Sequence, residues 1–97
     1  MRVRDVAALV AEGSYTRVYL AAERPMLVLR RMTSWETSLP APPFLRAERS
    51  LIINVERVAE LVIRSREEGA LTLDAEGAPT LELGRVALTR LRGALAK

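Results

Sequence analysis

Arginine is the residue type that points most directly to a chemistry in this chain of 97 residues. The only lysine among the 15 basic residues is Lys97, so the other fourteen are arginine. A guanidinium presents a planar fork of donors that fits a phosphate or the O6 and N7 edge of guanine. The net charge of +3 also favours an anionic partner. A GC-rich genome, whose codons favour arginine and alanine, explains the composition equally well, so the arginine count alone does not decide.

Enzymatic chemistry has few residues available in this sequence. The chain has no histidine and no cysteine, which removes the commonest general base, the thiolate nucleophile and the zinc–thiolate site. The serines have no histidine to activate them, no glycine-rich loop is suited to a phosphate, and no carboxylates have metal-ligand spacing. The sequence therefore predicts a protein that is not an enzyme and that uses no metal or cofactor.

Length and composition predict a single domain over residues 1–97. Hydrophobic residues make up 49% of the chain and charged residues 28%, which excludes disordered, collagen-like and coiled-coil proteins. No apolar run approaches the ~18 residues of a membrane span, and the N-terminal segment is too weakly apolar for a signal peptide. We therefore expect a cytoplasmic protein without a membrane partner.

Short strands dominate the hydrophobic pattern. Residues 6–11 are apolar and residues 15–20 alternate, and Gly13-Ser14 between them predicts a hairpin turn. Leucines with period two predict a half-exposed antiparallel meander near the C-terminus. Asn54 is expected to cap a brief turn. The other expected strands cover residues 26–30, 44–46, 51–53, 58–64, 70–75 and 80–83.

Two short helices complete the predicted architecture. Thr33 and Glu36 have the spacing of a capping box, and the prolines from Pro40 onward end the helix they open, which gives a helix at about 33–39. Helical spacing of apolar residues predicts a second helix at about 85–96. The expected fold class is mainly β, with short antiparallel strands. Strands separate the helices, which excludes a helix-turn-helix.

The sharpest motif is residues 44–54, which read Phe-Leu-Arg-Ala-Glu-Arg-Ser-Leu-Ile-Ile-Asn. This segment resembles the LytTR family of bacterial DNA-binding domains, whose hallmark is Phe-x-Arg-x-His-Arg-Ser-aromatic-apolar-Val-Asn. The positions that match in type and spacing are Phe44, Arg46, Arg49, Ser50 and Asn54.

Three other segments resemble the same family in the same order. Residues 11–16 are similar to its acidic-x-Gly-Asn-Tyr-Thr turn, and residues 33–40 take the place of its Leu-x-x-Leu-x-x-x-Leu-Pro segment. Residues 83–85, Leu-Gly-Arg, are similar to the Val-Ser-Arg that opens its final helix. The resemblance covers about residues 5–96, nearly the whole chain. Four motifs in the family's order are more specific than any one of them.

The resemblance implies a β-rich fold whose inter-strand loops enter successive major grooves of double-stranded DNA. It further implies transcriptional regulation at paired direct repeats in promoters, in a response regulator of a two-component system. Implied partners are a homodimer on DNA and a receiver domain or sensor kinase. Arg46 is expected to support the scaffold or position a phosphate rather than read a base. The DNA-binding residues implied by position are Thr16, Arg17, Arg46, Arg49, Ser50 and Arg85.

Departures from the family pattern leave an alternative open. Glu48 replaces the family histidine, Leu51 the aromatic residue, Ser14 the asparagine of the turn, and Gly84 the serine before the final arginine. A carboxylate near a phosphate adds repulsion. The alternative is a protein-interaction or dimerisation module that keeps a LytTR-like fold and has lost DNA binding. At Arg49 itself, the alternative to a DNA contact is a structural ion pair with a neighbouring glutamate, Glu48 or Glu56.

Overall fold

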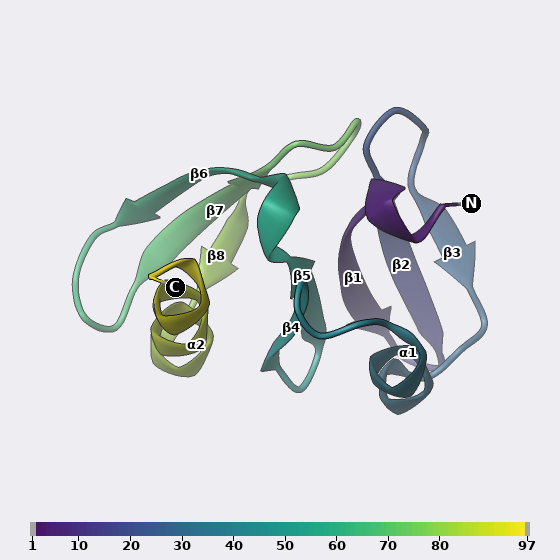
Figure 1. Cartoon of the computed structure of the whole chain (residues 1–97), viewed down its shortest axis with the longest axis horizontal. Helices are drawn as coiled ribbons and strands as arrows, with labels where there is room; N and C mark the ends of the chain where they lie inside the picture. Colours follow the sequence, from purple (N-terminus) through teal and green to yellow (C-terminus); the bar gives the residue numbers. More distant parts are fainter. Residues whose placement is uncertain (1, 97) are drawn as a thin grey trace.

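Two antiparallel sheets and two α-helices make up the computed structural model, which describes residues 2–96 (Figure 1). Met1 and Lys97, the ends of the predicted domain, lie outside the described residues. In chain order the elements are the 3-10 turn η1 (Val3–Asp5), β1 (Val6–Glu12), β2 (Tyr15–Leu20), β3 (Met26–Val28), α1 (Met32–Ser38), β4 (Phe44–Glu48), β5 (Leu51–Asn54), the 3-10 turn η2 (Val55–Arg57), β6 (Val58–Ile63), β7 (Gly69–Leu73), β8 (Leu81–Leu83) and α2 (Arg85–Leu95).

The larger sheet has the strand order β3-β2-β1-β5-β4, so β1 lies at its centre. Its first hairpin pairs Glu12 with Tyr15 around a turn in which Gly13 has φ +63°, a conformation that glycine adopts at little cost. Successive residues of one strand enter different cores: Val18 and Leu20 of β2 pack with α1, whereas Tyr19 packs with the second sheet. This alternation follows from the period of two in a strand. The sheet is therefore buried on both faces.

The smaller sheet, β6-β7-β8, carries α2 and closes the second core. The buried face of α2 consists of Ala87, Leu88 and Leu91. The helix approaches the backbone closely at Gly69, where an added Cβ would lie 3.0 Å from Leu88 Cδ1 and 3.0 Å from the carbonyl oxygen of Val62. Because α2 also contacts β4, it joins the two sheets.

The expected mainly β fold class with two short helices is confirmed. Trp35 and Phe44 are buried in the core. Asn54 caps η2 as expected: its Oδ1 accepts from the Glu56 amide at 3.0 Å. Its Nδ2 also donates to the carbonyl of Val6 at 2.9 Å. Asn54 thus connects the end of β5 to the start of the central strand.

The predicted capping box is wrong. Helix α1 begins at Met32 with Arg31 as its N-cap, and no side chain caps it. Met32 and Trp35, spaced by three residues, both bury against the larger sheet, and this tertiary packing sets the start of the helix. Thr33 is therefore the second helical residue, and Glu36 is free to pair with another element.

Strand β3 ends at Val28, two residues earlier than predicted. Its pairing with β2 stops where Val28 faces Thr16. The Thr16 hydroxyl then donates to the carbonyl of Arg30 at 2.6 Å, which holds the chain as it turns toward α1. The link from β3 to α1 therefore contains Arg30 and Arg31. No helix among residues 2–96 has the length and apolar character to cross a membrane.

Candidate nucleic-acid interface

Four segments meet along one side of the molecule, at the bottom of Figure 1. They are the β1–β2 turn (residues 13–14), the β3–α1 link (29–31), the β4–β5 turn (49–50) and the start of α2 (84–85). The first three line a common shallow hollow, to which they contribute Gly13, Arg31, Arg49 and Ser50 together with neighbouring residues. Helix α2 reaches the same place, because the Arg90 side chain donates to the Arg46 carbonyl at 3.4 Å. We call these four segments and the side chains on them the loop edge.

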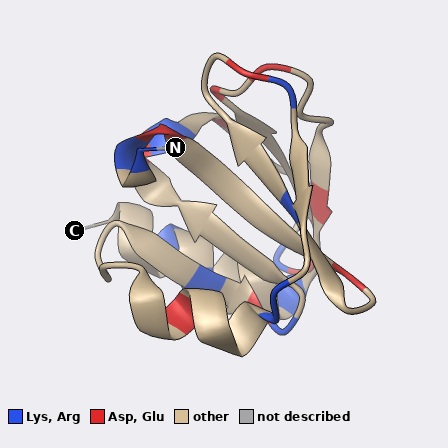
Figure 2. Cartoon of the chain, turned by 90° about the vertical axis from the view of Figure 1, so that its right-hand side faces the viewer, with Lys and Arg blue, Asp and Glu red and all other residues tan. Residues whose placement is uncertain are grey.

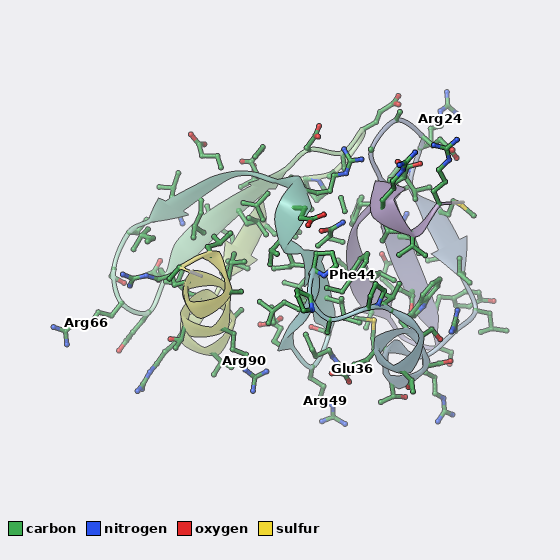
Figure 3. The ribbon with its side chains drawn as sticks, in the orientation of Figure 1. Arg24, Glu36, Phe44, Arg49, Arg66 and Arg90 are labelled. Atoms are coloured by element: carbon green, nitrogen blue, oxygen red, sulfur yellow. The ribbon has the colours of Figure 1, made fainter. Side chains whose placement is uncertain are left out.

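Arg49 occupies the tip of the β4–β5 turn and points away from the protein (Figure 3). Its side chain is exposed and forms no ion pair with any residue in the range 2–96. The structural ion pair with Glu48 or Glu56 considered for this residue is not formed. The Glu48 carboxylate accepts instead from the Ser50 hydroxyl, with Oε1 3.1 Å from Oγ. The Arg49 fork is therefore available to an external acceptor.

Arg46 lies behind this turn and holds it. Its Nη1 is 2.8 Å from Oε1 of Glu36 on α1, its Nε donates to the Glu48 carbonyl at 3.1 Å, and its Nη2 donates to the Arg49 carbonyl. The side chain is only 19% exposed. A guanidinium with its donors occupied in this way positions its neighbours, in accord with the scaffold role considered for it.

Thr16 is fully buried, at 0% exposure. Its hydroxyl donates to the Arg30 carbonyl and also lies 3.8 Å from the Met32 sulfur. The side chain therefore does not reach the surface, and the expected contact between Thr16 and DNA is contradicted by its burial. Because β2 is inside the sheet at this position, Thr16 serves to anchor the β3–α1 link.

Arg17 is partly exposed and pairs with Glu12 across the first hairpin, with Nη2 3.1 Å from Oε1 and a second, shorter contact from Nε to Oε2. The hydrogen bond from Arg17 lowers the pKa of the Glu12 carboxyl, and the same bond raises the pKa of Arg17. The charge of Arg17 is therefore compensated within the protein.

Arg85 is the first residue of α2 and is exposed. The N-cap, Gly84, supplies no side-chain hydrogen bond, so amides of the first turn stay open to an external acceptor. A shallow hollow at the start of the helix is lined by Arg85, Val86, Thr89 and Arg90. Figure 3 shows Arg90 extending toward the same side as Arg49.

The sequence model of the family described as the LytTr DNA-binding domain matches residues 1–96. The chain belongs to this family. The curated CO-responsive transcriptional regulator RcoM of Rhodospirillum rubrum is 38% identical over 92 residues, which cover 94% of this chain and 38% of that protein. The chain thus spans well under half the length of this relative.

The fold of this LytTR domain is also found in a solved structure. The LytTr DNA-binding domain of a putative methyl-accepting/DNA response regulator from Bacillus cereus matches it with a TM-score of 0.81. The match covers 100% of this chain and 86% of that chain, at 20% sequence identity. The LytTR-like fold inferred from the motifs is confirmed.

The charged side chains at the loop edge of the LytTR domain fall into two groups, those that form ion pairs and those that do not. The carboxylates of Glu12 and Glu36 are neutralised by Arg17 and Arg46. Figure 2 shows basic segments in the loops at this lower end, with acidic segments between them. Among the described residues, Arg31, Arg49 and Arg85 of the loop edge and Arg90 on the adjoining part of α2 have no ion pair, and neither has Arg30, whose guanidinium is held by other protein groups.

Sequence reasoning missed Arg31 and Arg90 as members of this group. Arg31 was missed because the predicted capping box at Thr33 left it in a link without a role, whereas in the structure it is the N-cap of α1. Arg90 lies in the C-terminal segment that carries no acidic residue, and this charge pattern was the available signal. Arg30, by contrast, is occupied: its guanidinium lies 4.2 Å from the ring centroid of Trp35 and its Nε donates to Ser34 Oγ at 3.1 Å.

Proposed function

We propose that this LytTR domain binds double-stranded DNA sequence-specifically in transcriptional regulation, with its loop edge in the major groove. The observation that carries the proposal is the set of guanidiniums on this edge that have no acidic partner in the described chain. They come from three different elements, the β3–α1 link, the β4–β5 turn and α2. Basic side chains that converge from separate loops can follow a phosphate backbone and reach base edges without a reading helix.

Each arginine has a distinct part in this proposal. Arg49, at the tip of its turn, is suited to a bidentate contact with O6 and N7 of a guanine. Arg85 is suited to a phosphate, because the first-turn amides of α2 favour the same anion. Ser50, exposed beside Arg49, orients the Glu48 carboxylate through its hydroxyl. Arg46 fixes the backbone that presents Arg49 and Ser50.

Recognition of paired direct repeats belongs to the same proposal. One module of this size contacts a short site, so two copies on adjacent half-sites, as a homodimer on promoter DNA, would supply the specificity. The relative from Rhodospirillum rubrum is described as CO-responsive. We propose that this domain acts in the cytoplasm and is likewise controlled by a signal that is received outside the LytTR fold. A receiver domain or a sensor kinase would supply that signal.

The experiment that tests the proposal is sequence selection from random duplexes, followed by affinity measurements on the selected duplex at several salt concentrations. We expect one motif to be enriched and affinity to fall steeply with salt. Arg49→Ala and Arg85→Ala should each weaken binding, and Arg85→Ala should also reduce the salt slope by about one unit. The matched control is Arg24→Ala, because Arg24 is exposed at the opposite end of the molecule (Figure 3). Equal binding by all three variants would refute the proposed interface.

A protein-interaction module is the second candidate, favoured by an apolar sheet edge. Strand β3 lies at one end of the larger sheet, and Met26, Leu27 and Leu29 on or beside it are exposed. Open strand edges with apolar side chains favour pairing with another chain. Under this function, selection would enrich no motif and the isolated domain would form a stable homodimer.

A further inference from the structure

Glu48 is the loop-edge carboxylate that pairs with no guanidinium in the described part of the chain. Glu12 and Glu36, the other two carboxylates near this edge, are each bound to an arginine. Glu48 lies at the end of β4, directly before Arg49, and is half-buried. An uncompensated carboxylate here repels phosphates, so its presence on a DNA-facing edge calls for a contact other than a phosphate.

The position of the Glu48 side chain is fixed from two directions. Its Oε1 accepts from the Ser50 hydroxyl at 3.1 Å, which holds the carboxylate over the β4–β5 turn. Its carbonyl accepts from Arg46 Nε at 3.1 Å, just after a β-bulge between Arg46 and Glu48. Oε2 has no hydrogen-bond partner within residues 2–96. A pre-oriented acceptor therefore lies on the residue directly before Arg49.

We propose that Glu48 is a specificity-determining residue that accepts a hydrogen bond from the N4 amine of a cytosine in the major groove. The inference rests on the proposed DNA-binding function and names a base that the edge selects. An ionised carboxylate only accepts, and guanine and thymine offer only acceptors in the major groove, apart from the thymine methyl. Adenine offers the N6 amine but places its N7 lone pair beside it, which repels the second carboxylate oxygen. On its own base cytosine N4 is flanked by C5–H, so no lone pair of that base faces the second carboxylate oxygen.

Sequence selection with three proteins tests this assignment. The proteins are the unaltered chain, Glu48→Ala, and the matched control Glu60→Ala, which removes one exposed carboxylate from β6. We expect the unaltered chain and the control to enrich the same motif. Glu48→Ala should lose the cytosine preference at one position and keep the others. On defined duplexes, replacing that C·G pair should weaken the unaltered chain by about tenfold and Glu48→Ala hardly at all.

Glu48→Gln gives the assignment a second readout that does not depend on lost binding. Glutamine keeps the length of the side chain and can donate as well as accept, which suits adenine N6 and N7. We expect the selected base at that position to change from cytosine to adenine. If the unaltered chain enriches a motif and both Glu48 variants enrich it unchanged, the role of Glu48 is overturned while DNA binding stands. If the unaltered chain enriches nothing, the proposed function itself is overturned.

Discussion

Arg46 and Arg49 are three positions apart, and the structure predicts different effects for their replacement by alanine. Arg46→Ala should lower the free energy of unfolding, whereas Arg49→Ala should lower the affinity for DNA. Arg46→Ala removes hydrogen bonds to the carbonyls of Glu48 and Arg49, about 0.5–1.5 kcal/mol each. It also removes an ion pair with Glu36, which adds at most about 1 kcal/mol because Glu36 is half exposed. The free energy of unfolding should therefore fall by about 1–4 kcal/mol, and the melting temperature by about 4–8 °C for each kcal/mol.

Arg49→Ala should leave the free energy of unfolding within about 0.5 kcal/mol of the unaltered chain, because the Arg49 side chain contacts no partner in residues 2–96. Its affinity for the selected duplex should fall by about 1–3 kcal/mol, or about 5- to 150-fold. Thermal unfolding by circular dichroism and binding by fluorescence anisotropy measure the two quantities on the same preparations. If Arg49→Ala lowers the melting temperature as much as Arg46→Ala does, the division into a contact residue and a supporting residue is refuted.

Three further substitutions test other parts of the structure. Thr16→Val should lower the free energy of unfolding by about 1–2 kcal/mol in chemical denaturation, since the Arg30 carbonyl loses its donor. Arg17→Ala should return the pKa of Glu12 toward its ordinary value in an NMR titration. The Glu12–Arg17 pair stabilises the fold above the unfolded-state pKa of Glu12, and this contribution disappears as the pH falls through the lowered folded-state pKa. Asn54→Ala should cost about 2–3 kcal/mol, because two hydrogen bonds of a buried side chain are lost together.

The strands could be predicted from the sequence because both faces of the larger sheet are buried by different partners. Alternate residues of β2 pack into different cores: Val18 lies in the core beneath α1, and Tyr19 lies in the core beneath the second sheet. The start of α1 could not be predicted in this way. A capping box is a local signal, and the burial of Met32 and Trp35 against the sheet outweighed it.

The location of the candidate site and a supporting role for Arg46 were within reach of sequence reasoning, but the contacts that give Arg46 this role were not. As matches to the family pattern, Arg46 and Arg49 are equivalent. What separates them is the position of Glu36, ten residues away on α1, which only the packing of that helix brings within 2.8 Å of Arg46. Thr16 was misjudged for the same kind of reason, because its partner, the Arg30 carbonyl, is fourteen residues away.

Some guanidiniums at the loop edge are hydrogen-bonded within the protein and others are not, and this division explains how loops can recognise DNA. When a flexible loop becomes ordered on binding, the lost conformational entropy lowers the affinity. A turn that the protein already holds in place has no such loss. At the β4–β5 turn the fixing groups are Arg46, bonded to two carbonyls, and Ser50, bonded to Glu48. The groups left over, the Arg49 guanidinium and the second oxygen of Glu48, are a donor fork and an acceptor on consecutive residues. That pair is complementary to a guanine and a cytosine in the major groove, so the chemistry of recognition follows from which hydrogen bonds the fold has already made.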